Sequence, residues 1–268
     1  MLKTLKIEWM KVKHYRTFWI LLILTIISIP AFNYTLYDLF DNSFPKIRGK
    51  SFFGSPFAFP DVWQTVTWNS SLLFIIPAIL IITLSTNEFT YRTHRQNIID
   101  GWSRSQFVNV KLFEVLLLSI VTTLVVFLTC LFFGLVVNKT PADAHIFSNM
   151  RFIFFFFVQM VSYSIIAFLL SMLIKRSGLS MGIFFVYMVM EQFVVSILRN
   201  KYNMKWVDFL PEEVTDKLIP QPYSQKLLST AAWNTNWENH IPVYLLIGAL
   251  YLTLYCLFTS WRFRKADL

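Results

Sequence analysis

The fold is decided by residues 152–174, which read FIFFFFVQMVSYSIIAFLLSMLI. They carry no charged side chain, and most of them are large and apolar. A helix needs roughly 20 such residues to cross the hydrocarbon core of a bilayer, which is about 30 Å thick. We therefore predict a transmembrane helix here, and we apply the same criterion outward along the chain.

Six segments satisfy this criterion: 18–37, 62–84, 115–137, 152–174, 179–198 and 241–261. The second is the least uniform, because polar residues fill its first half and Pro77 should kink its second half. The whole chain is 56% hydrophobic and only 15% charged, whereas soluble domains carry about 25% charged residues. We expect an all-α membrane protein with one six-span domain, residues 18–268, and not a soluble enzyme.

The distribution of charge orients these spans. With six spans both termini share one side, and that side holds 14 basic and 5 acidic residues, while the remaining 10 basic and 10 acidic residues cancel. The formal net charge of +9 therefore lies on one face. Because basic residues favour the cytoplasmic side, we expect both termini to be cytoplasmic, and we expect no nucleic-acid partner.

Residues 1–17 precede the first span and read as an amphipathic helix. Leu2, Leu5, Trp9 and Val12 recur at spacings of three and four, the period of one helical face, and Lys residues lie off that face. This pattern predicts an interfacial (elbow) helix in the headgroup layer of the bilayer.

The inner loop between the second and third spans, residues 86–107, reads TNEFTYRTHRQNIIDGWSRSQF. Glu88 and Arg92 stand four residues apart, which stabilises a helix, and Asp100-Gly101 forms a natural stop. The sequence predicts a charged helix of about three turns that presents a polar surface to a cytoplasmic partner; a solvated connecting loop is the alternative.

Together, the basic Trp-containing start LKIEWMKVKHYRTFW, the six spans and the segment NEFTYRTHRQNIIDGWSRSQF resemble the permease subunit of a bacterial ATP-binding cassette transporter of the type 2 exporter family. The resemblance implies that 87–104 is the coupling helix that docks on a separate ATPase subunit. The implied docking residues are Glu88, Arg92, Arg95, Asp100 and Arg104. It also implies a second permease copy or a related permease, and a location in the bacterial inner (cytoplasmic) membrane.

Polar residues inside the spans are candidates for function by default. Glu191 with Gln192 in the fifth span is the clearest case, and Asn69 and Gln159 are weaker ones. They could line a translocation path or a subunit interface, or Glu191 could have a structural partner such as Lys111 or Arg151. Lys111 and Glu114 are expected to form a local pair.

The outer segment 199–240 is long for a structureless loop. In the resembled family this connection commonly dips back as short re-entrant helices, for which 202–210 and 224–232 are the candidates here. An ordered cap without a gating role fits the sequence equally well.

No recognisable catalytic or metal-binding motif occurs. The sequence lacks G-x-x-x-x-G-K-[ST], H-E-x-x-H and G-x-S-x-G, so ATP and Mg are expected in the partner ATPase and no cofactor in this chain. We expect a permease for an amphipathic or hydrophobic substrate, such as a lipid, peptide or drug. A non-transporting inner-membrane scaffold or sensor is the alternative, and a secondary transporter is a third interpretation.

Overall fold

The computed structural model describes residues 2–42, 46–47, 50–51, 56–137, 146–223 and 231–265. Most of these residues are helical, which confirms the all-α class. The helices are, in chain order, α1 (Leu2–Lys13), α2 (Arg16–Asn42), α3 (Val62–Ser71), α4 (Ile75–Thr90), α5 (Thr93–Ile99), α6 (Arg104–Val137), α7 (Arg151–Ile174), α8 (Ser177–Tyr202), the 3₁₀ helix η1 (Lys205–Phe209), α9 (Glu213–Asp216) and α11 (Ala231–Lys265). Two strands of two residues, β1 (Lys46–Ile47) and β2 (Lys50–Ser51), pair antiparallel between α2 and α3.

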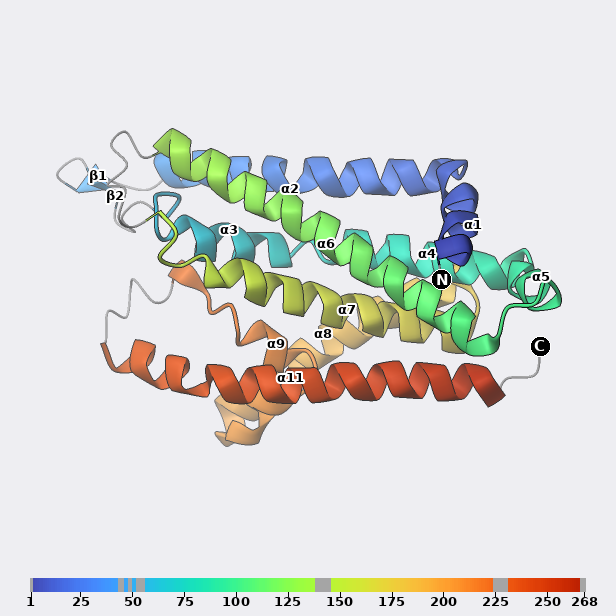
Figure 1. The fold of residues 1–268 in the computed structure, drawn as a ribbon. Coiled ribbons are helices and arrows are strands. Elements are labelled where there is room, and N and C mark those ends of the chain that lie inside the picture. Colours follow the sequence, from blue (N-terminus) through green and yellow to red (C-terminus); the bar gives the residue numbers. More distant parts are fainter. Residues whose placement is uncertain are drawn as a thin grey trace.

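The long helices form a bundle around α7, the segment quoted at the outset (Figure 1). Helix α7 packs against α3, α4, α6, α8 and α11, and its fully buried side chains include Phe156 and Phe168. Helix α1 crosses one end of the bundle instead of running along it, and α5 and the C-terminal end of α11 lie at that same end (Figure 1). We call this the α5 end. The two ends of the chain therefore share one side of the bundle.

Among the described residues, five helices are long and apolar enough to cross a membrane: α2, α6, α7, α8 and α11. The sixth predicted span is a bent pair, α3 and α4, whose axes differ by 48°. At the bend, the amides of Leu72 and Phe74 bond the carbonyls three residues back. Pro77 cannot donate to the Leu73 carbonyl, which accepts from the Ile76 amide instead at 3.1 Å. The predicted kink is present, and it lies three to five residues before the proline.

Two helices begin ten or more residues earlier than the apolar runs indicate. Helix α6 begins at Arg104 instead of residue 115, and α11 begins at Ala231 instead of residue 241. An apolar run marks where a helix can meet lipid, whereas backbone hydrogen bonds continue through polar residues beyond it.

In the outer segment, η1 falls within the predicted stretch 202–210, and α9 was not predicted. Most of 224–232 lies outside the described residues.

Candidate functional site

The predicted coupling segment 87–104 is not a single helix, which corrects the sequence interpretation. Helix α4 ends at Thr90, Arg92 adopts a left-handed conformation with φ 56°, and α5 occupies only Thr93–Ile99. Gly101 is also left-handed, with φ 94°, and α6 begins at Arg104. Arg92 therefore breaks the helix, and the expected helical pair of Glu88 with Arg92 does not form.

The short helix presents an exposed surface at the α5 end of the bundle. We define the apex surface as Tyr91, Arg92, Arg95, Ile99 and Asp100, all of which are exposed; Ile99 is 78% exposed. The Gln96 amide donates to Asp100 Oδ1 at 3.1 Å across the last turn. Three of the five predicted docking residues thus lie on the apex surface, and Arg104 is half-buried beside it.

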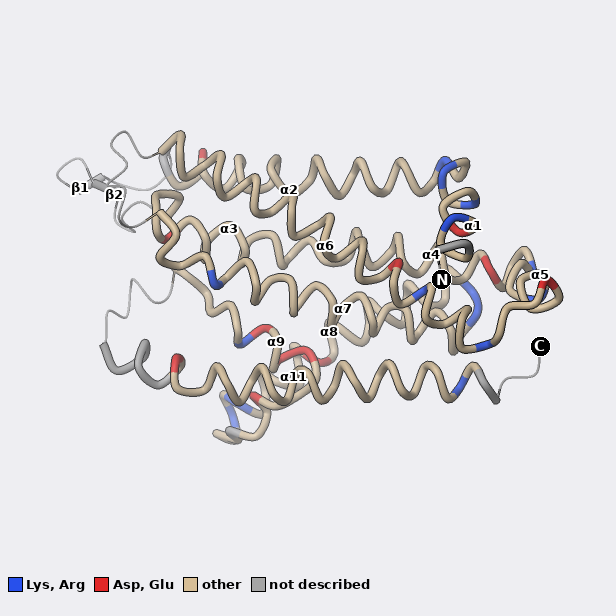
Figure 2. Tube along the Cα trace, viewed as in Figure 1, with Lys and Arg blue, Asp and Glu red and all other residues tan. Residues whose placement is uncertain are grey.

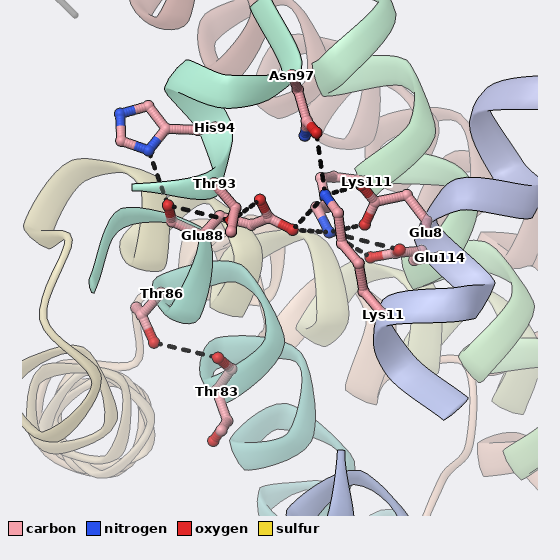
Figure 3. Close-up of polar contacts among 10 residues, drawn as sticks. All are labelled: Glu8, Lys11, Thr83, Thr86, Glu88, Thr93, His94, Asn97, Lys111 and Glu114. Carbon is pink, nitrogen blue, oxygen red and sulfur yellow. Dashed lines mark hydrogen bonds and ion pairs between the residues drawn. The ribbon is translucent and has the colours of Figure 1, made fainter. Parts of the chain in front are cut away.

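The fifth, Glu88, is not available for docking, because its carboxylate lies in a buried ion network (Figure 3). The Lys111 ammonium lies at the centre, with Nζ 2.6 Å from Glu8 Oε2, 3.1 Å from Glu88 Oε1 and 3.1 Å from Glu114 Oε2. The side chains of Lys111 and Glu8 are each only 3% exposed. The predicted pairing of Lys111 with Glu114 is confirmed, as one contact within a larger network.

A second ammonium, that of Lys11, extends the network to α5. Lys11 Nζ lies 2.7 Å from Glu8 Oε1 and 3.1 Å from Asn97 Oδ1, and it approaches Glu88 Oε1 at 3.4 Å. Lys11 also lies 5.9 Å from the centre of the Trp102 ring, a cation–π distance. The network therefore joins four elements: α1 through Glu8 and Lys11, α4 through Glu88, α5 through Asn97, and α6 through Lys111 and Glu114.

Two further hydrogen bonds fix the start of α5 against the end of α4 (Figure 3). The Thr93 hydroxyl donates to Glu88 Oε2, and His94 Nδ1 lies 2.7 Å from the Glu88 carbonyl oxygen. Both side chains, from the first turn of α5, bond to Glu88 near the end of α4. These two hydrogen bonds stabilise the turn through Arg92. A helix of seven residues is too short to be stable alone. These contacts with α4 and α1 therefore stabilise α5.

The electrostatics of the network favour the charged form of Glu8. Burial alone would raise the pKa of Glu8, but the attraction and hydrogen bonds of Lys111 and Lys11 outweigh it and lower this pKa from 4.5 to about 2. Glu8 is therefore ionised at neutral pH and holds the two ammonium groups in place.

The elbow residues predicted from the sequence lie on α1 as follows. Leu5 and Val12 are half-buried, and Trp9 is 52% exposed; the side chain of Leu2 lies outside the described residues. The most buried described side chain of α1 is Glu8, which the apolar pattern did not single out. One signal could have found it: Glu8 is the only acidic residue among the first 37.

Three of the four predicted intramembrane polar residues, Gln159, Glu191 and Gln192, contact α9 or the residues just before it. Asp216 accepts hydrogen bonds from Gln159 Nε2 at 2.7 Å, Tyr163 Oη at 2.8 Å and Gln192 Nε2 at 2.8 Å. Burial, opposed by these donors, raises the pKa of Asp216 from 3.8 to about 7. Gln159 and Gln192 therefore hold the returning outer segment.

Glu191 binds the same segment, not Lys111 or Arg151 as the sequence suggested. Its Oε1 accepts the backbone N–H groups of Glu212 at 2.7 Å and Glu213 at 3.3 Å. Glu212 is fully buried, and neither of its carboxyl oxygens has a hydrogen-bond partner among the described residues. Burial, with the nearby negative charges of Glu191 and Asp216, raises the pKa of Glu212 to about 9.

Asn69 lies apart from this group, in the bent span. It donates to Asn33 Oδ1 at 3.1 Å and accepts from Tyr223 Oη at 3.0 Å. It therefore ties α2 and α3 to Tyr223 of the outer segment, and the four intramembrane candidates form two separate clusters.

Within the described ranges, no group of three or more His, Cys, Asp or Glu side chains is arranged to hold a metal ion. The sequence model of a family described as "ABC-2 family transporter protein" matches residues 4–191 of the 268. The match includes most of α1, the apex surface and the whole ion network. A comparison with curated proteins finds no match.

Proposed function

The chain belongs to the ABC-2 transporter family, whose members are non-catalytic membrane permeases, and we propose that it is the permease subunit of an ATP-driven exporter. A separate ATP-binding cassette subunit would bind ATP and Mg and supply the energy. Two permease copies, identical or related, would form the path for an amphipathic or hydrophobic substrate. The α5 end of the bundle would face the cytoplasm of a bacterial cell, in keeping with the basic residues gathered there (Figure 2).

The observation that carries this proposal is the apex surface together with the network behind it. The apex combines Arg92, Arg95 and Asp100 with two exposed hydrophobic side chains, Tyr91 and Ile99. Charged residues at the rim of a protein contact set register and partner choice, while an exposed aromatic residue supplies contact area. We therefore assign the docking of the ATPase to this surface and not to the whole of 87–104.

The buried network gives the apex a way to move the spans. A load applied to α5 reaches α4 through Thr93 and His94, and it reaches α6 and α1 through Lys111 and Lys11. These contacts lie inside the protein, where ion pairs are weakly screened by salt. We expect α5, the inner halves of α4 and α6, and α1 to shift as one body when the ATPase closes.

Charge reversal at the apex tests the docking. The permease is co-expressed with a cassette ATPase, and co-purification, ATP hydrolysis and substrate export are measured in proteoliposomes. The double variant Arg92→Glu/Arg95→Glu should lose ATPase binding and export while it still inserts in the membrane. The matched control is Lys201→Glu, a charge reversal at an exposed residue at the far end of α8, which should leave both unchanged.

The same measurements separate a permease from a scaffold. An exporter requires that ATP hydrolysis by the partner depends on the permease and is abolished by the apex variant. Normal co-purification and normal export by Arg92→Glu/Arg95→Glu would refute the docking assignment. ATPase binding without any ATP-dependent transport, for every substrate class tried, would favour the scaffold or sensor.

A further inference from the structure

A cavity of about 420 Å³ lies between α1, α2, α4 and α6, directly beside the ion network. Its volume is in the range of small-molecule sites, which is about 300–1,000 Å³. The buried side chains of Ile81, Val115 and Leu118 form its floor, and the more exposed Trp9, Trp19 and Leu117 lie at its rim. The cavity is therefore apolar and opens away from the bundle, toward the surface that lipid would cover.

The depth of the cavity matches one leaflet of a bilayer. Along α6 its lining extends from Lys111 to Val121, a separation of ten residues that rises about 15 Å at 1.5 Å per residue. Half of a hydrocarbon core about 30 Å thick is the same length. One end of the cavity is polar, with Lys111 and Glu114, and the other end is apolar, with Val121 and Leu22. This is the polarity of a lipid lying along α6 with its headgroup at the α5 end.

Two tryptophan side chains at the rim of the cavity are held in place by contacts within the protein. The rings of Trp9 and Trp19 meet edge to face with centroids 6.4 Å apart, and the Trp19 indole N–H donates to the Lys13 carbonyl at 2.9 Å. Tryptophan prefers the depth of the lipid headgroups, because its ring is apolar and its N–H is polar. The mouth of the cavity thus lies at the level where a lipid chain enters the hydrocarbon core.

The charged groups at the polar end select the headgroup. The network holds three carboxylates, Glu8, Glu88 and Glu114, against two ammonium groups. An ammonium has three N–H donors, and both Lys11 and Lys111 direct theirs at partners inside the network. Glu114 lines the cavity and keeps 21% of its side chain exposed. Glu114 therefore offers the cavity a carboxyl group as hydrogen-bond acceptor, which suits a headgroup with N–H donors better than one without them.

We propose that this cavity binds one acyl chain of a lipid whose headgroup carries a primary ammonium, with that ammonium at Glu114. The proposal requires that the chain lies in a bilayer, but it does not depend on ATPase docking or on transport. A lipid in this position would complete the packing between α1 and the spans, and it would supply a positive charge to a network that has one carboxylate in excess.

Lipid retention by the purified full-length chain tests the site. The protein is equilibrated in vesicles of phosphatidylethanolamine and phosphatidylglycerol, equimolar and with identical acyl chains, then extracted in mild detergent and examined by native mass spectrometry. We expect one tightly held phosphatidylethanolamine per chain, retained about tenfold over phosphatidylglycerol, the ratio expected for one charge-assisted hydrogen bond. Equal retention of the two lipids would overturn the proposed headgroup contact.

Two variant pairs separate the headgroup from the chain. Glu114→Gln should abolish the preference for phosphatidylethanolamine, while Glu238→Gln, at an exposed ion pair elsewhere, should keep it. Val121→Phe, which fills the apolar end, should lower retention of both lipids, whereas Leu124→Phe, one turn further and 54% exposed, should not.

Each variant is checked by its unfolding midpoint, and the two pairs probe the site independently. The proposal is wrong if Glu114→Gln keeps the preference, or if Val121→Phe and Leu124→Phe retain the same amount of lipid. Because neither readout involves ATP, a negative result leaves the proposed function standing, and loss of ATPase docking leaves the lipid site standing.

Discussion

Replacing Lys111 by Met should destabilise the protein strongly, because Lys111 is the centre of the buried network. The substitution keeps the length of the side chain and removes the ammonium that contacts Glu8, Glu88 and Glu114 within 3.1 Å. Only Lys11 then remains to compensate three carboxylates. Breaking a buried ion pair by removing one partner costs about 3–5 kcal/mol, and we expect a loss in this range. At about 2–4 °C per kcal/mol this lowers the unfolding midpoint by on the order of 10 °C.

The assay is thermal unfolding of the purified chain in detergent at neutral pH, followed by tryptophan fluorescence. The matched control is Arg151→Met, which removes the cation of the Arg151–Glu238 pair, whose two side chains are 43% and 50% exposed. Exposed pairs contribute about 0–1 kcal/mol, so the control should shift the midpoint by a few degrees at most. Amide hydrogen exchange should also increase in α1 and α5, which the network holds.

The double variant Glu8→Gln/Lys111→Met completes a thermodynamic cycle. If Lys111 acts on Glu8 directly, removing both should cost clearly less than the sum of the two single changes, by about 0.5–3 kcal/mol. The reasoning is refuted if Lys111→Met shifts the midpoint no more than Arg151→Met does, or if the two single effects simply add.

Two further predictions concern the core of the bundle. Glu212→Gln should flatten the pH dependence of stability. In the wild type the folded carboxyl, with its pKa raised from 4.5 to about 9, keeps a proton that the unfolded chain releases, so the free energy of unfolding falls as pH rises between these values. Unfolding midpoints measured from pH 5 to 9 that fall equally in both proteins would contradict this. Gly134→Ala should cost about 1–3 kcal/mol, because a Cβ there would overlap the ring of Phe59. Gly182→Ala, whose Cβ would have no atom within 4 Å, should stabilise α8 by about 1 kcal/mol. Chemical denaturation of both variants checks this, and equal effects on the free energy of unfolding would show that the Phe59 contact is not tight.

The sequence predicted the spans well because the bilayer imposes one simple requirement, which is length of apolar helix. Residues 152–174 lie within α7, and the other predicted segments lie within described helices or within the bent pair. The kink in the second span was also predictable, because Pro77 has no N–H. The ends were less predictable, since helices α6 and α11 continue through polar residues that hydropathy does not count.

The candidate site was predicted in location but not in its internal arrangement. Arg92 and Glu88 have the spacing of a helical pair, yet Arg92 is left-handed and Glu88 points into the bundle. What decides this is contact with Lys11, 77 residues earlier in the chain, and with Lys111. Local spacing carries no information on such partners, so a charge that sequence reasoning assigns to a surface can belong to the interior.

The charged residues assigned to the α5 end also divide into buried members of the network and other residues. Of the 14 basic and 5 acidic residues assigned to that side, Lys11 and Lys111 with Glu8, Glu88 and Glu114 are engaged in the network. Counted on the sequence alone, this leaves twelve other basic and two other acidic residues assigned to that side. Most of the charges that we propose to orient the chain in the membrane are therefore different residues from the five that form the network. It follows that neutralising the network should cost stability and coupling without inverting the topology, whereas topology should respond to the other twelve.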